Sequence, residues 1–255
     1  MQKRTSSNSI KTRIISLFDE AQNLLYPTNK IKTTKYNVIT FLPLSILFQF
    51  TTYSNIYFLL VAIILAIKKI SPQDPTVALI PFIFVIIVGV LVELFEEIKK
   101  WRNDTNFNNS TTIKVNTSTN EESKVKWAEL KVGDVIKVQK NETIPSDILI
   151  IKSSLTNHFC YMQTTNLDGE SALKPRELIT LLQNKLNPLN SNNKKINIDV
   201  SLLEGATIEI ELPNANIYKC NGSLSLKNKE KSYIQIDNIL LRGTTLKNTD
   251  YVYGV

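Results

Sequence analysis

One stretch of the sequence decides how the rest is interpreted: Thr164-Thr165-Asn166-Leu167-Asp168-Gly169-Glu170-Ser171-Ala172-Leu173-Lys174. Asp168-Gly169 is a turn signal, because glycine tolerates a positive φ angle and an aspartate side chain can bond its own backbone. Such a turn can hold the next carboxylate, that of Glu170, away from the scaffold. Similar turns are common in loops without a function, so the flanking segments must decide between a solvated turn and a site.

The composition divides the chain into two unlike halves. Hydrophobic residues make up 43% of the chain, but they are concentrated between residues 38 and 95, and most of the later sequence is rich in Asn, Lys and Thr. The formal net charge is +7, yet the basic residues are scattered and not interleaved with aromatic ones. We therefore expect no nucleic acid partner. A membrane surface is the simpler partner, since several bases flank the apolar region.

Two apolar runs predict a helical hairpin in a phospholipid bilayer. The first covers residues 38–67 with a polar break at 51–55, and the second, residues 75–92, is uncharged and long enough to span. Prolines punctuate the turn between them. Lys and Arg are more frequent before the first run and after the second than in the turn, so the positive-inside rule places both ends in the cytosol. Two buried helices of a soluble protein are the alternative.

From about residue 111 the hydrophobic pattern changes to the alternation typical of β-strands. Strands are expected at residues 112–115, 125–127, 135–138, 144–151, 196–198, 208–212, 233–236 and 239–241. A turn is expected at Gly133-Asp134 and a surface insertion at 187–195. One helix is expected at 175–186, since Pro175 suits a first helical turn.

The expected organisation has three parts. Residues 1–35 form a cytosolic N-terminal arm without a cleavable signal peptide, because no apolar run follows the polar, basic start. Residues 36–100 form the transmembrane hairpin with its cytosolic continuation, and residues 101–255 form a mostly β cytosolic domain. Cys160 and Cys220 are expected to be reduced thiols, and with a single histidine, His158, the sequence predicts no metal site.

Further patches follow one another along the chain: Thr34-Lys35-Tyr36-Asn37, Phe41-Leu42-Pro43, Gln49-Phe50, Asn55, Tyr57-Phe58-Leu59, Ser71-Pro72, Pro81, Glu93, Glu97, Arg102, Asp104, Asn108, Val132-Gly133-Asp134, Ile144-Pro145-Ser146-Asp147, Arg176, Leu240-Leu241-Arg242-Gly243 and Leu246-Lys247-Asn248-Thr249. With this ordered set, the chain resembles the N-terminal part of a P-type ATPase of the phospholipid-translocating (P4, flippase) branch. The resemblance implies the first two membrane helices and an actuator domain, a distorted β-sandwich or jelly roll, here truncated at its C-terminal end. Ion pumps of the family usually carry Thr-Gly-Glu where this chain has Asn-Leu-Asp-Gly-Glu.

The resemblance also implies roles for individual residues. Glu170 would position the water that hydrolyses an aspartyl-phosphate, with Asp168, Gly169 and Ser171 supporting the loop. Since a general base needs a carboxylate next to the water, we expect Glu170 to be free of a salt bridge. The implied lipid path along the two membrane helices includes the following residues: Gln49, Asn55, Leu65 and Ala66. The last two depart from the polar residues usual in the family, and Ser171 replaces a threonine.

The resemblance finally implies partners that the chain does not supply. No Asp-Lys-Thr-Gly-Thr motif is present, so this chain is not expected to hydrolyse ATP alone or to bind a cofactor; Mg and ATP are implied for a complete pump. The remainder of the pump, an accessory subunit and a late secretory, endosomal or plasma membrane are implied as well. Two alternatives stay open: a truncated, non-catalytic relative that serves as a structural or regulatory membrane subunit, and a membrane-anchored β adaptor without pump ancestry.

Overall fold

The computed structural model describes residues 12–17, 19, 23, 25–67, 74, 76–116, 119, 121–185, 203–214 and 216–255. The chain divides into two compact units: Met1–Lys30 with Asn109–Val255, here the β unit, and Ile31–Asn108, here the helical unit. This division differs from the expected boundaries at residues 35 and 100. The segment before residue 31 belongs to the β unit because β1 (Thr12–Ser16) pairs with β8 (Thr207–Glu211).

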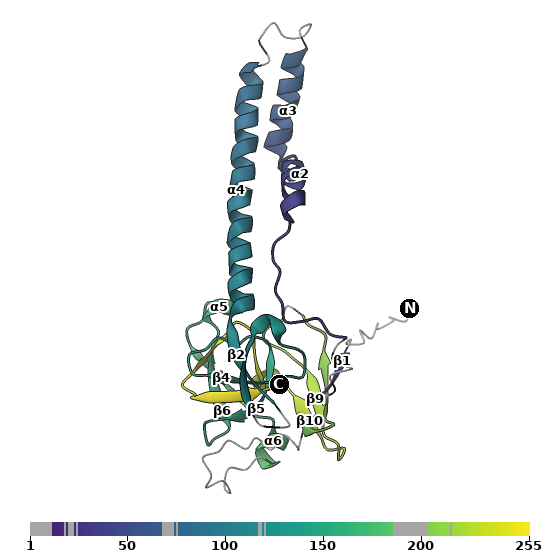
Figure 1. Ribbon diagram of the computed structural model, residues 1–255, viewed down its shortest axis with the longest axis vertical. Helices are drawn as coiled ribbons and strands as arrows, with labels where there is room; N and C mark the ends of the chain where they lie inside the picture. Colours follow the sequence, from purple (N-terminus) through teal and green to yellow (C-terminus); the bar gives the residue numbers. More distant parts are fainter. Residues whose placement is uncertain are drawn as a thin grey trace, which may run out of the picture. The chain divides into compact units, whose positions relative to one another are not determined.

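The helical unit contains α2 (Val38–Gln49), α3 (Tyr53–Ala66) and most of α4 (Thr76–Asn109) (Figure 1). By length and composition α4 could cross a membrane, and only 6% of its apolar window is buried. α2 and α3 pass the same test only as a pair, and they are bent by 80° at their break. The first expected span is thus a broken helix. Most of the expected turn, residues 68–73 and 75, lies outside the described residues.

Within its described residues the β unit contains three antiparallel sheets. The six-stranded sheet has the order β11 (Ile239–Leu240), β5 (Ile148–Ser153), β13 (Tyr251–Gly254), β4 (Val135–Gln139), β2 (Thr111–Val115), β3 (Glu122–Lys126). The four-stranded sheet has the order β1, β8, β9 (Gly222–Ser225), β10 (Lys231–Ile234). The three-stranded sheet has the order β12 (Thr245–Lys247), β6 (Phe159–Gln163), β7 (Leu173–Glu177).

Two hydrophobic cores use opposite faces of the six-stranded sheet. Along β5, Ile150 belongs to the core that contains Met162 of the three-stranded sheet, while Leu149 belongs to the core that contains Leu224 of the four-stranded sheet. The six-stranded sheet is therefore the middle layer. A strand buried on both faces is a continuous apolar run without alternation, which explains the sequence of β5.

Most of the expected strands in the described residues are confirmed, but the helix expected at 175–186 is wrong in its first part. Residues 173–177 form β7, in which Arg176 pairs with Cys160 of β6, and α6 (Thr180–Lys185) begins only afterwards. Pairing with β6 overrides the helix-start signal of Pro175, because the ladder satisfies backbone groups that a helix would otherwise pair. The segments expected at 187–195 and 196–198 lie outside the described residues.

Candidate functional site

The loop that follows β6 is shaped by a single helical turn and a glycine. α5 (Thr165–Asp168) ends at Gly169, whose φ of 78° is left-handed. Glycine adopts this conformation without a steric penalty and is the usual residue after a helix end. A Cβ atom built at Gly169 would meet nothing within 4 Å, so this turn faces open space. Glu170 therefore directly follows an accessible turn of the backbone.

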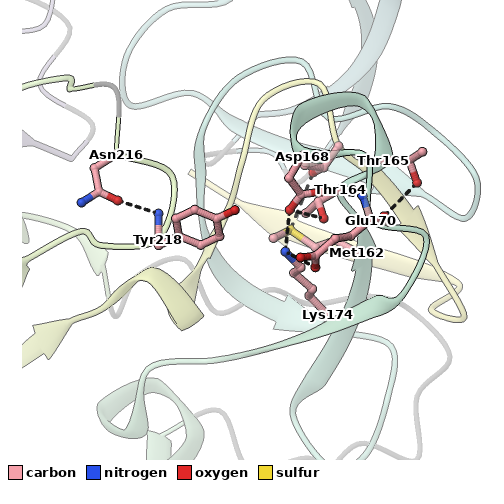
Figure 2. A network of polar contacts seen from close by, with 9 residues as sticks. Met162, Thr164, Thr165, Asp168, Glu170, Lys174, Asn216 and Tyr218 are labelled. Atoms are coloured by element: carbon pink, nitrogen blue, oxygen red, sulfur yellow. Dashed lines mark hydrogen bonds and ion pairs between the residues drawn. The ribbon is translucent and has the colours of Figure 1, made fainter.

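The Asp168 carboxylate holds the loop together (Figure 2). It accepts hydrogen bonds from the Glu170 amide (3.0 Å), the Thr164 hydroxyl (3.0 Å) and the Lys174 ammonium (2.6 Å). Its side chain is only 7% exposed. These bonds, with Lys174 foremost, lower the pKa of Asp168 to about 2. Asp168 is thus ionised at neutral pH, and the turn bonded to its own backbone is the one that the Asp-Gly pair predicts.

Glu170 is exposed but not unpaired, so that expectation is wrong. Its side chain is 57% exposed, and its Oε2 lies 3.0 Å from the Nζ of Lys174. Lys174 lies on β7, and Asp168 fixes its ammonium between the two carboxylates. The bonds to Asp168 and then to Glu170 raise the pKa of Lys174. The same ammonium lies 5.6 Å from the centre of the Tyr218 ring, so it is a shared cation beside the loop (Figure 2).

The remaining loop contacts fix the backbone. The Thr165 hydroxyl donates to the Glu170 carbonyl (3.0 Å), and the Asn166 amide donates to the carbonyl of Gly243 (3.1 Å). Ser171, expected to support the loop, is exposed, and the bonds described above are made by other side chains. The pairing of Lys174 with Glu170 could have been predicted from their spacing of four residues. Nothing in the sequence, however, connects the distant Tyr218 with the loop.

A cavity of about 330 Å³ adjoins the loop. Asp168 and Lys174 line it together with a second ion pair, Arg176 and Asp237. Burial lowers the pKa of Arg176. The two carboxylates balance the two cations, so these four groups give the cavity no net charge with which to attract an ionic ligand. The other side of the loop, at Gly169 and Glu170, is exposed.

The helical unit brings two of the four expected lipid-path residues together. The Asn55 amide donates to the backbone carbonyl of Gln49 (2.7 Å) and to its side-chain Oε1 (3.3 Å). Asn55 is 4% exposed, and it satisfies a carbonyl left free where α2 ends. Leu65 and Ala66 lie at the other end of α3, about 15 Å along the helix from Asn55. The structure does not gather all four into one site.

Neither cysteine belongs to the loop. Both Cys160 and Cys220 are free thiols, and burial raises the pKa of Cys160 to about 12, which keeps that thiol protonated and unreactive. Among the described residues, no group of three or more His, Cys, Asp or Glu side chains is placed to hold a metal ion.

Comparisons with known proteins match both units. Residues 15–79 match the family model of the phospholipid-translocating ATPase N-terminal region, and residues 107–252 match that of the P-type ATPase actuator domain. Probable phospholipid-transporting ATPase 12 of Arabidopsis thaliana is 36% identical over 92% of this chain and 19% of its own length. Phospholipid-transporting ATPase DRS2 of Saccharomyces cerevisiae is 32% identical over 95% of this chain and 17% of its own length. Phospholipid-transporting ATPase IC of Mus musculus is 35% identical over 90% of this chain and 17% of its own length. The chain spans less than a fifth of the length of each.

Proposed function

We propose, since this chain belongs to the phospholipid-translocating (P4) branch of the P-type ATPases, that it forms the actuator and the first membrane segments of an ATP-driven phospholipid pump. The observation that carries the proposal is the position of Glu170: an exposed carboxylate directly after a left-handed glycine, on a loop that Asp168 holds through one backbone amide and two side chains. A rigid loop that presents one carboxylate is what the positioning of a reacting water requires.

The proposed reaction is the hydrolysis of an aspartyl-phosphate on a part of the pump outside this chain. Glu170 orients a water and takes its proton as the water oxygen bonds to phosphorus and the bond from phosphorus to the aspartate oxygen breaks. Gly169 allows the backbone to approach the phosphate, because no side chain stands in the way. Asp168 supports the loop through its three hydrogen bonds. ATP and Mg enter through the phosphorylation step, which other parts of the pump perform.

The ion pair with Lys174 is compatible with this role. Glu170 is more than half exposed, and exposed ion pairs are weak because water competes for both charges. Lys174 keeps its second, shorter bond to the buried carboxylate of Asp168 when Glu170 turns towards a substrate. Lys174 also offsets one of the two negative charges, those of Asp168 and Glu170, that an approaching phosphate would meet. Lys174 thus holds Glu170 until the phosphoenzyme arrives.

The helical unit belongs to the same proposal. α4 and the bent pair α2–α3 form a two-helix hairpin in the bilayer, both chain ends face the cytosol, and the β unit is the family's distorted jelly roll. At the bend, the buried Asn55 is hydrogen-bonded to the half-buried Gln49, and a lipid headgroup that reaches this break could replace these bonds with its own. Leu65 and Ala66 form the apolar end of the lipid path. An accessory subunit and a late secretory, endosomal or plasma membrane complete the proposal.

The test uses a chimera in which this chain replaces the matching part of the yeast relative. The chimera is phosphorylated with labelled ATP, and the decay of the phosphoenzyme is followed for Glu170→Gln, which keeps the shape and removes the charge. We expect the decay to slow by about 100-fold or more. Glu129→Gln, at an exposed carboxylate of the same unit, should decay as the parent does. Equal decay of the Glu170 variant and the parent would show that Glu170 has no part in hydrolysis.

A further inference from the structure

Residues 31–37, here called the strap, connect the β unit to α2 as an extended segment without a strand partner (Figure 1). Side chains of α4 bind its backbone instead. The Asn108 amide accepts from the Ile31 N–H and donates to the Ile31 carbonyl, both at 2.8 Å. Asp104 accepts from the Thr33 N–H (2.7 Å) and from the Thr33 hydroxyl (2.8 Å). The first half of the strap is thus attached to α4 at alternate residues.

The second half of the strap continues the same pattern. Glu97 accepts a hydrogen bond from the Lys35 N–H at 3.0 Å, and Glu93 accepts one from the Tyr36 hydroxyl at 2.6 Å. Alternate amides of an extended chain point to one side, while residues separated by four and seven positions lie on one face of a helix. The two periodicities match from Ile31 to Lys35, so one face of α4 binds one edge of this part of the strap.

The contacts are not incidental surface bonds. Glu97 is 8% exposed and Asp104 is 7% exposed, and a carboxylate removed from water must be bonded to remain ionised. The backbone amides of Ile31, Thr33 and Lys35 are donors, and a donor removed from water likewise needs an acceptor. These contacts form a ladder between the strap and α4. Separation would leave the buried Asp104 carboxylate without the Thr33 donors, while Glu97 would keep its ion pair with Lys100.

Bonds within the β unit lead from the candidate loop to Asn29, two residues before the strap begins. Asn166 of α5 donates to the Gly243 carbonyl (3.1 Å), and the guanidinium of the preceding residue, Arg242, donates to the Asn29 carbonyl (3.4 Å). Asn29 is itself fixed, since its amide donates to the carbonyls of Trp127 (2.9 Å) and Pro145 (3.1 Å). One residue, Lys30, separates Asn29 from the strap.

We propose that Glu97, Asp104 and Asn108 are coupling residues: their ladder makes the strap and α4 one mechanical body, so that a movement starting at the loop displaces α2 and α4 together. This inference rests on the proposed function, in which hydrolysis at the loop drives lipid transport. Without the ladder, the strap is a flexible tether, and rotation of the β unit is absorbed in its backbone. The expected defect is therefore loss of coupling between hydrolysis and transport, with hydrolysis retained.

The first test asks whether the ladder holds the strap. Amide hydrogen exchange is measured residue by residue on the whole chain in lipid nanodiscs. In Asp104→Ala/Asn108→Ala, exchange at Ile31 and Thr33 should rise by about tenfold or more, because their acceptors are gone. The matched control, Glu96→Ala/Asn103→Ala, removes one carboxylate and one amide from exposed positions of the same helix and should leave both rates unchanged. Unchanged exchange in the ladder variant would overturn the proposal.

The second test measures function in the chimera with the yeast relative. For the ladder variant, the number of lipids transported per ATP hydrolysed should fall by about threefold or more, while Glu96→Ala/Asn103→Ala keeps the parent ratio. A parent ratio in a variant whose strap amides have lost protection would overturn the coupling proposal alone. A parent chimera that forms phosphoenzyme but transports no lipid would instead contradict the proposed function, and the coupling role with it, even with the strap protected.

Discussion

At the scale of single residues, the side chain of Asp168 makes more of the bonds that shape the candidate loop than the side chain of Glu170 does. Its carboxylate oxygens accept hydrogen bonds from a hydroxyl, a backbone amide and an ammonium, and these bonds determine where the next two residues lie. Glu170 is held only through its backbone and one exposed ion pair. The side chain of Glu170 is thus 57% exposed, while that of Asp168 is 7% exposed and bonded to three groups.

Replacing Lys174 by methionine should raise the pKa of Asp168 from about 2 towards the ordinary value of an aspartate, about 3.9. Because the folded pKa lies below the unfolded one, the stabilisation from Asp168 is complete above about pH 4 and is lost as the pH falls towards 2. Carboxyl-carbon NMR titration measures this value directly. Lys124→Met, at an exposed strand position, is the control. An unchanged Asp168 titration in Lys174→Met would refute the assigned cause.

Two glycines with positive φ make a matched pair. Alanine at Gly169 should destabilise the chain by about 1–2 kcal/mol, the cost of a left-handed alanine. No steric clash adds to this cost, because the Cβ would meet open space. Alanine at Gly133 has the same strain at φ 90°, and its Cβ would lie 2.6 Å from the Asn23 amide, which donates to the Ser16 carbonyl. Urea unfolding should show the larger loss at Gly133. The reverse order would contradict the described packing at β1.

At the scale of elements, β5 carries the fold because it lies between two cores. Its apolar run was sufficient to predict a strand, but not where the strand begins: Ile144 is fully buried, yet it precedes the strand, and Pro145 next to it lacks the N–H that a ladder needs. The strand starts at Ile148. A run of apolar residues shows burial, and the position of proline decides how much of it can pair.

Ile150→Ala in β5 should destabilise the β unit by about 2–5 kcal/mol, the usual cost of truncating a buried isoleucine, because its side chain is 0% exposed. Ile14→Ala in β1 is the matched control: the same substitution in a strand at a position that is 62% exposed. It should change the stability by no more than about 0.5 kcal/mol. Urea unfolding followed by tryptophan fluorescence measures both. Similar losses would contradict the layer assignment.

The sequence predicted elements with a local signal and missed those that depend on distant partners. The strands at 112–115, 135–138 and 208–212, the turn at Gly133 and the Asp-Gly turn all carry their own pattern. β6 and β7 do not, because they exist by pairing with each other and with β12. The site shows the same division. The role of Asp168 as the bonded turn residue follows from the residues around it, whereas the place of Tyr218 follows only from the folded chain.

At the scale of the whole molecule, the apolar surface of the helices is the main feature. Large hydrophobic side chains along α2, α3 and α4 are exposed, including Leu47, Phe84 and Phe95. Patches of this extent on a soluble monomer would be an aggregation hazard, and a bilayer removes them from water. The family to which the chain belongs consists of lipid-transporting membrane pumps, which agrees with this surface.

The chain should therefore remain in the membrane pellet after vesicles are washed with alkaline carbonate. Peripheral proteins detach under these conditions, while segments inserted through apolar surface do not. A peripheral protein added to the same vesicles serves as the control and should appear in the supernatant. Release of the chain together with that control would contradict the membrane placement of α4.

The most direct measurement of the whole account is lipid transport by the chimera with the yeast relative, reconstituted in vesicles with a fluorescent phospholipid and ATP. We expect ATP-dependent movement of the lipid between leaflets with Glu170 in place. In Glu170→Gln we expect a loss of that movement that parallels the slowed decay of the phosphoenzyme. Transport by Glu170→Gln at the parent rate would contradict the claim that this loop drives the membrane helices.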